Sequence, residues 1–105
     1  MYVQMFKFKS RLPNEEVQRI MEERAPRFRA LPKLVQKFYG YEESTGMHTG
    51  IYIWDSAASA KAYLDTELAK TIATAYQVQA PPRVELFEVI FPLRDMVTRS
   101  DAAVE

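Results

Sequence analysis

Residues 34–55 read LVQKFYGYEESTGMHTGIYIWD, and they carry the clearest structural signal in the chain. Side-chain character alternates over residues 34–42 and again over residues 47–55, which is the two-residue period of a β-strand. The polar segment 43–46 separates the two runs, and Gly46 can adopt a positive φ at no steric cost. The segment therefore predicts a β-hairpin. The second strand has two faces, with Met47, Thr49, Ile51 and Ile53 opposite His48, Gly50, Tyr52 and Trp54.

Two further strands are predicted near the ends of the chain. Residues 2–8 alternate, with Val3 and Met5 on one face and an aromatic-rich set on the other. That second set comprises Tyr2, Gln4, Phe6 and Phe8. Residues 83–91 alternate as well, and Pro92 ends this fourth strand because proline has no backbone N–H to donate.

Two helices are predicted between the strands. Apolar residues recur near helical spacing from Val17 to Leu31, with Pro13 and two glutamates suited to the first turn. Pro26 is expected to bend or interrupt this helix. Asp55 and Ser56 can cap a second helix over residues 57–68, and residues 68–76 either continue it or form a separate turn.

The resulting order βαββαβ predicts an α+β fold of the ferredoxin-like class. In this sandwich one four-stranded antiparallel sheet carries both helices on one face. A chain of 105 residues can form one hydrophobic core but has no room for two. We predict one domain over residues 1–92 and a C-terminal tail over residues 93–105.

Both faces of the predicted sheet are apolar, although helices can cover only one. Eight aromatic residues assigned to one face would form a larger exposed patch than monomers tolerate. They are Phe6, Phe8, Tyr39, Tyr41, Tyr52, Trp54, Phe87 and Phe91. We therefore predict that the sheet also faces a partner, most simply a second copy of the chain in a homodimer. The alternation does not show which set of residues meets the helices.

Composition and motifs exclude several classes of protein. The formal net charge is +0, which gives no general attraction to nucleic acid or to anionic membranes. The chain has no cysteine and one histidine, His48, so thiolate and multi-histidine metal sites are excluded within one chain. It contains no phosphate-binding glycine loop and no apolar run of spanning length. We predict a cytoplasmic protein without a metal, flavin or haem cofactor.

One stretch shares features with the third strand of the RNA-recognition motif. Residues 48–54 (HTGIYIW) combine a glycine with alternate aromatic residues on a βαββαβ order. The stretch lacks the basic first position and the second small residue of that motif. Together with the zero net charge, this makes nucleic-acid binding a minor alternative.

Two longer stretches resemble a known family. Residues 22–32 (EERAPRFRALP) lead into residues 34–39 (LVQKFY), and residues 50–55 (GIYIWD) are followed by residues 58–64 (ASAKAYL). These stretches resemble the YdhR-type monooxygenases of the dimeric α/β-barrel superfamily, which includes the antibiotic-biosynthesis monooxygenases. The resemblance implies a homodimer whose two sheets face each other as a barrel, with a pocket in each subunit between sheet and helices.

The resemblance also implies an activity. Some members of the superfamily oxidise polyphenolic or quinol-type substrates with dioxygen and no metal or flavin. Others degrade haem through an iron-ligating histidine on the second helix, where this chain has none. The resemblance therefore implies a cofactor-independent monooxygenase of small aromatic or quinol-type substrates.

Five side chains form the candidate site for such a reaction. A deprotonated phenol can itself donate an electron to dioxygen, so the protein must only exclude water, orient the ring and hold the phenolate. His48 is the candidate base, and Trp54 and Tyr52 are candidate hydrogen-bond donors and ring platforms. Tyr39 and Tyr63 are candidate substrate-binding residues. The alternative for the four aromatic residues is core or dimer packing, and for His48 a place at the surface or rim.

A second class of function stays open on the sequence. A non-catalytic barrel of this fold could bind a small apolar ligand or serve in a stress response. A pocket that holds polar tips and His48 favours the oxygenase, whereas a pocket filled by the chain's own side chains favours a structural role.

Overall fold

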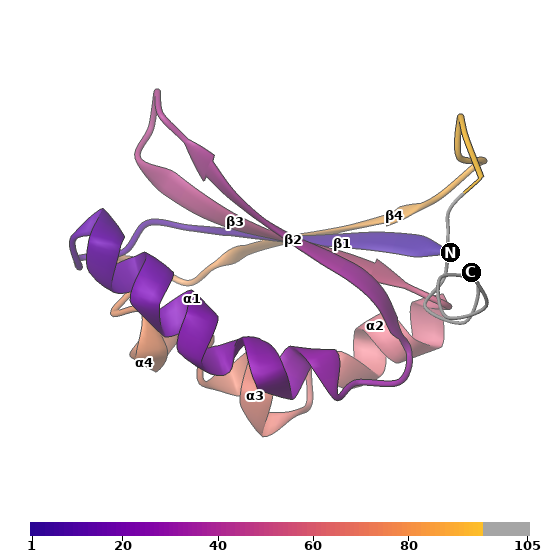
Figure 1. The fold of residues 1–105 in the computed structure, drawn as a ribbon, viewed down its shortest axis with the longest axis horizontal. Helices are drawn as coiled ribbons and strands as arrows, with labels where there is room; N and C mark the ends of the chain where they lie inside the picture. Colours follow the sequence, from indigo (N-terminus) through magenta and orange to yellow (C-terminus); the bar gives the residue numbers. More distant parts are fainter. Residues whose placement is uncertain (96–105) are drawn as a thin grey trace, which may run out of the picture.

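A computed structural model describes residues 1–95 as two layers, a four-stranded sheet and a layer of helices on one of its faces (Figure 1). The other face of the sheet carries no helix within this range (Figure 1). The elements in chain order are β1 (Tyr2–Phe8), α1 (Asn14–Arg29), β2 (Leu34–Glu42), β3 (Met47–Trp54), α2 (Ala57–Tyr63), α3 (Glu67–Lys70), α4 (Ile72–Ala75) and β4 (Arg83–Glu88).

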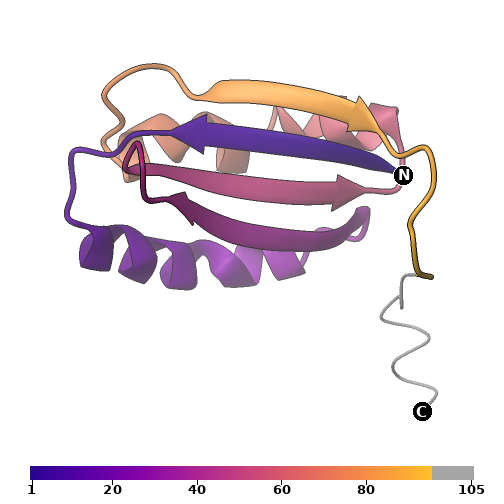
Figure 2. The same cartoon turned by 90° about the horizontal axis from the view of Figure 1, so that it is seen from above.

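The sheet has the strand order β2-β3-β1-β4, and each neighbouring pair is antiparallel (Figure 2). β2 and β3 form the predicted hairpin, and Gly46 in its turn has a φ of 75°. β1 lies at the centre, where Gln4 is paired with Tyr52 on one side and with Leu86 on the other. The predicted ferredoxin-like α+β fold is confirmed.

The aromatic face of the sheet is the one that meets the helices. Burial alternates along β3, so that His48, Gly50, Tyr52 and Trp54 are buried and the residues between them are partly exposed. The buried apolar core consists of Phe6, Phe8, Val17, Phe28, Tyr52, Trp54, Ala60, Tyr63, Ile72 and Tyr76. Helices α1, α2 and α4 each contribute to this core, which explains why one layer of helices can cover so many aromatic rings.

The assignment of Phe87 to the aromatic face is wrong. Phe87 is paired with Val3 across β4 and β1, so its side chain lies on the outer face, away from the helices. Phe91 lies beyond the end of β4. The outer face instead carries two rows of paired apolar residues, which we call the outer apolar face. Its members are Val3, Met5, Phe38, Ile51, Ile53 and Phe87.

The predicted second helix is shorter than expected. α2 ends at Tyr63, and the Thr66 hydroxyl accepts a hydrogen bond from the Ala69 amide, which caps the separate helix α3. α1, in contrast, continues through Pro26 to Arg29, so the predicted interruption is wrong. Proline removes one donor from the helix, but its carbonyl still accepts a hydrogen bond from the Ala30 amide.

Two strand details also differ from the prediction. β4 ends at Glu88 rather than at residue 91, and Glu88 is opposite Tyr2, the first residue of β1. One more backbone hydrogen bond, from the Val89 amide to the Met1 carbonyl at 3.0 Å, follows the strand. The alternation over residues 34–42 predicts Leu34, Gln36 and Phe38 on one face, but a register shift between Leu34 and Gln36 places these two on opposite faces of β2. The predicted tail 93–105 lies largely outside the described residues.

Gly50 has no side chain, and the ring of Tyr52 lies close to the place that a Cβ atom would occupy. A Cβ atom at this position would lie 2.8 Å from Tyr52 Cε1, closer than real Cβ contacts. Tyr52 is only 2% exposed and packs against the rings of Phe6 and Phe28, so it has little freedom to move. We expect Gly50→Ala to lower the free energy of unfolding by about 1–3 kcal/mol, measured by urea denaturation. An unchanged unfolding midpoint would show that this contact relaxes freely.

Candidate functional site

An open groove runs between α1 and the edge strand β2. It contains two adjoining cavities of about 560 Å³ and about 470 Å³. Ala25, Arg29 and Tyr39 line both cavities, so the cavities are continuous along the groove. Volumes of this size accommodate small-molecule ligands.

His48 reaches the first cavity from β3. The residue is 7% exposed, and its ring lies between those of Phe8 and Tyr41, with centroid distances of 6.1 Å and 4.9 Å. Burial lowers the pKa of His48 below its ordinary value, so the imidazole is neutral at pH 7. Its buried Nδ1 has no hydrogen-bond partner within residues 1–95. Because Nδ1 is buried, a proton from a ligand in the cavity would have to be accepted by the other ring nitrogen, Nε2.

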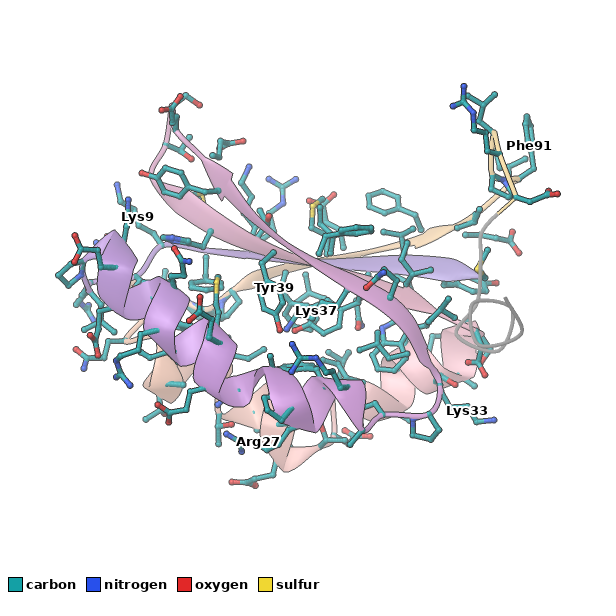
Figure 3. The ribbon with its side chains drawn as sticks, viewed as in Figure 1. Lys9, Arg27, Lys33, Lys37, Tyr39 and Phe91 are labelled. Atoms are coloured by element: carbon teal, nitrogen blue, oxygen red, sulfur yellow. The ribbon has the colours of Figure 1, made fainter. Side chains whose placement is uncertain are left out.

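Tyr39 lies at the junction of the two cavities. It comes from β2, and its side chain lies between the sheet and α1 (Figure 3). Burial raises the pKa of Tyr39, and the positive charges of Arg29 and Arg24 oppose this effect. The phenol is therefore protonated at pH 7 and can donate a hydrogen bond to a ligand.

Tyr52, Trp54 and Tyr63 lie deeper, in the core behind the groove. The Tyr52 and Tyr63 hydroxyls are 3.1 Å apart, and burial raises the pKa of both phenols, that of Tyr63 to about 12. The Trp54 indole N–H donates to Gln4 Oε1 at 3.0 Å, and Gln4 Nε2 donates to the Ala60 carbonyl at 3.1 Å. These three residues therefore use their polar atoms within the protein, and none of them lines the two large cavities.

The structure thus divides the five predicted residues into two groups. His48 and Tyr39 share the first cavity, whereas Tyr52, Trp54 and Tyr63 pack against one another in the core. A void of about 20 Å³ lies between the groups, and both Tyr39 and Tyr52 line it. The catalytic or binding roles of all five residues stay predictions.

Lys37 is a groove residue that the sequence analysis missed. It is paired with Tyr52 across β2 and β3, and its side chain lies beneath the sheet, next to α1 (Figure 3). Its Nζ is 3.2 Å from the centre of the Phe28 ring and 4.3 Å from that of Tyr39. Burial, with a smaller contribution from the charge of Arg24, lowers the pKa of Lys37 to about 7. The signal available in the sequence was its position on the same strand face as Tyr39.

Arg24 is a second buried cation near the groove. Its guanidinium donates to the Leu68 carbonyl at 2.8 Å and to Thr71 Oγ1 at 3.3 Å, which ties α1 to the short helix α3. Its Nε has no hydrogen-bond partner within residues 1–95. Arg24 is 5% exposed and makes no ion pair with any residue of this range. The core side of the groove therefore carries positive charge that no carboxylate of the described chain offsets.

Side chains that could hold a metal ion do not gather in the described part of the chain. Across residues 1–95 no three of the His, Asp and Glu side chains lie close enough to form a binding group. Nor does any helix in this range combine the length and apolarity needed to cross a bilayer.

Comparison with solved structures shows the same fold in several proteins. The cofactor-independent oxygenase SnoaB from Streptomyces nogalater aligns with a TM-score of 0.70 at 17% sequence identity, over 90% of this chain and 97% of SnoaB. A "putative antibiotic biosynthesis monooxygenase" from Deinococcus radiodurans aligns with a TM-score of 0.70 at 12% identity, over 91% and 99% of the two chains. Rv0793 from Mycobacterium tuberculosis also gives 0.70, at 9% identity, over 89% and 98%. These identities establish the fold alone.

Sequence comparison is more specific. No curated protein matches the chain. Residues 3–98 match the family model described as "Putative mono-oxygenase ydhR", which is most of the 105 residues. The resemblance noted in the sequence is therefore confirmed, and the chain belongs to the ydhR mono-oxygenase family.

Proposed function

We propose that this chain is a cofactor-independent monooxygenase that oxidises small aromatic or quinol-type substrates in the groove between α1 and β2. The observation that carries the proposal is the neutral imidazole of His48 at the wall of a cavity of about 560 Å³. Family membership and the shared fold of a cofactor-independent oxygenase support it.

The reaction needs few protein groups. For an anthrone-type methylene carbon, one oxygen atom of dioxygen replaces two hydrogens, and the other oxygen atom leaves as water. The substrate supplies all four electrons. His48 accepts the first proton, which makes the substrate electron-rich enough to react with dioxygen, and Tyr39 donates a hydrogen bond to the ionised oxygen. Tyr52, Tyr63 and Trp54 form the rigid wall behind this site.

The test is dioxygen uptake by the purified protein with a panel of quinols and anthrones and no added metal, flavin or haem. Uptake should rise with pH as the substrate ionises, while His48 stays neutral above its lowered pKa. His48→Ala should reduce the rate by about 10²–10⁴-fold, the usual contribution of a general base. Ser44→Ala changes an exposed turn residue outside the groove and should leave the rate unchanged. If His48→Ala takes up dioxygen at the rate of the unmodified protein, His48 is not the base.

A second function is supported by a different observation. Trp54 and Tyr52 already use their polar atoms within the core, as expected if these residues serve packing rather than chemistry. The chain would then bind a small apolar or aromatic ligand, or act in a stress response, without converting the ligand. Absence of dioxygen uptake across the whole panel, together with measurable binding of the same compounds, would select this alternative.

We further propose that two copies of the chain form a homodimer through the outer apolar face. Phe38 and Phe87 on this face are 54% and 46% exposed in the single chain, and Val3, Met5, Ile51 and Ile53 lie between them. A patch of this kind, on a sheet face that no helix of residues 1–95 covers (Figure 1), is typical of an interaction surface. A two-fold axis would place the outer apolar face of one copy against the same face of the other copy.

A further inference from the structure

The amino group of Lys37 lies among aromatic rings at the wall of the second cavity. Its Nζ is 3.2 Å from the centre of the Phe28 ring, 4.3 Å from that of Tyr39 and 4.5 Å from that of Tyr52. Ring faces attract an ammonium ion, but they do not accept its three hydrogen bonds. No carboxylate within residues 1–95 pairs with Lys37.

The charged groups around Lys37 do not compensate it. α1 contributes Arg24, whose charge acts directly on Lys37, and Arg29, which lines the same cavity. β2 and β3 contribute the phenols of Tyr39 and Tyr52, which are neutral at pH 7. Glu22 of α1 lines only the first cavity, where its side chain is exposed. Within residues 1–95, the site therefore contains positive charge that no carboxylate offsets.

Lys37 is also within reach of a ligand. It lines the second cavity of about 470 Å³ together with the apolar side chains of Phe28, Leu31, Leu34 and Val35. An aromatic ring in this cavity would contact apolar walls, and a negatively charged oxygen on that ring could pair with the ammonium. A ligand of this kind would accept hydrogen bonds from the Lys37 ammonium group and would offset its positive charge.

We propose that the groove binds its aromatic ligand as an anion, with the ionised oxygen of the ring substituent at Lys37 Nζ. The proposal rests on the proposed function, because it assumes that the groove binds an aromatic ligand. It adds that the bound ligand is ionised and that Lys37 binds its charged oxygen. In the oxygenase reaction Lys37 and Tyr39 together hold the ionised oxygen of the substrate. Because each charge favours the other, binding of the phenolate also favours the charged form of Lys37.

The test uses 4-nitrophenol, whose phenolate absorbs visible light and whose neutral form does not. With protein in excess, a pH titration of this band gives the apparent pKa of the bound probe. We expect that pKa to be lower than in free solution by about 1 or more, because a cation lies beside the phenolate. Lys37→Met and Lys37→Gln should both abolish the shift, since both remove the charge and only glutamine keeps hydrogen-bonding atoms.

Two controls make the result specific. Lys33→Met removes a lysine that is 66% exposed and that points away from the groove, so it should preserve the shift (Figure 3). 4-Nitroanisole has the same ring without an ionisable oxygen, and its binding in equilibrium dialysis should be unchanged by Lys37→Met. Circular dichroism checks that each variant is folded.

An unshifted pKa of the bound probe, or an equal shift in the folded Lys37 variants, would overturn the proposal. The proposed function is tested separately by dioxygen uptake. If dioxygen is taken up but the pKa shift of the bound probe does not depend on Lys37, the oxygenase proposal is kept and the anion site is rejected. If the pKa shift depends on Lys37 but no dioxygen is taken up, the anion site is kept and the ligand-binding alternative is favoured.

Discussion

Phe87→Asp should convert the protein from a homodimer into a monomer. Sedimentation equilibrium at micromolar concentration should give about twice 12.2 kDa for the unmodified chain and about 12.2 kDa for the variant. Phe87 is paired with Val3 at the edge of the outer apolar face, where a partner would bury it. An unpaired carboxylate in such an interface costs several kcal/mol, and a two-fold dimer contains it twice. The dissociation constant should therefore rise by at least about a hundredfold.

A matched control places the same charge on the other layer. Leu64 is 40% exposed, close to the 46% of Phe87, but it follows α2 on the helix side of the sheet. Leu64→Asp should leave the sedimenting mass unchanged. A monomeric unmodified chain, or a Phe87→Asp variant that remains dimeric, would show that the outer apolar face is not the interface.

Lys37→Met should stabilise the protein at pH 6. The lowered pKa of Lys37, about 7 against 10.5, means that the folded chain holds this proton less tightly than the unfolded chain. The stability of the unmodified protein should therefore rise with pH between about 7 and 10.5 and be lowest below pH 7, where the buried amine must carry its charge. Methionine has a similar length and no charge, so the expected gain at pH 6 is about 1–3 kcal/mol.

The measurement is urea denaturation at pH 6 and pH 9 at one protein concentration. The unmodified chain should gain stability from pH 6 to pH 9, and Lys37→Met should show less of that gain. Lys33→Met should change the free energy of unfolding by no more than about 0.5 kcal/mol, as exposed substitutions usually do. A loss of stability in Lys37→Met at pH 6 would mean that the ring contacts outweigh the cost of burying the charge. A gain would fit a residue kept for binding at the expense of stability.

Much of the fold follows from local pattern. The alternation in β1 and β3 is regular because one face of each strand is buried under helices, and the hairpin turn requires a residue such as Gly46. Two boundaries could not be read in the same way. β4 ends at Glu88, opposite the first residue of β1, with one more backbone hydrogen bond from Val89 to Met1, so its end depends on pairing with β1 and not only on the residues that follow. The break between α2 and α3 depends on one side-chain cap at Thr66.

The site was less predictable than the fold, for a related reason. Periodicity showed that Tyr52 and Trp54 lie on the same face of β3. Because both faces of this strand are apolar, periodicity could not show that the polar atoms of these two residues form hydrogen bonds inside the core. Lys37 was overlooked because a lysine on an edge strand usually extends into water. Its burial depends on α1 lying across the strand, a tertiary contact that is not encoded near residue 37.

The hydrogen bond between Trp54 and Gln4 has a practical consequence for spectroscopy. Trp54 is the only tryptophan of the chain, it is 3% exposed, and its indole N–H is fixed at 3.0 Å from an amide oxygen. An indole shielded from water emits at shorter wavelength than an exposed one, so its fluorescence reports on a single place in the core. The rings of Tyr52 and Tyr63 lie 6.2 Å and 5.3 Å away, close enough to transfer excitation energy to it. Tyrosine emission would therefore be quenched in the folded chain and reappear on unfolding, which gives an internal optical signal without any label.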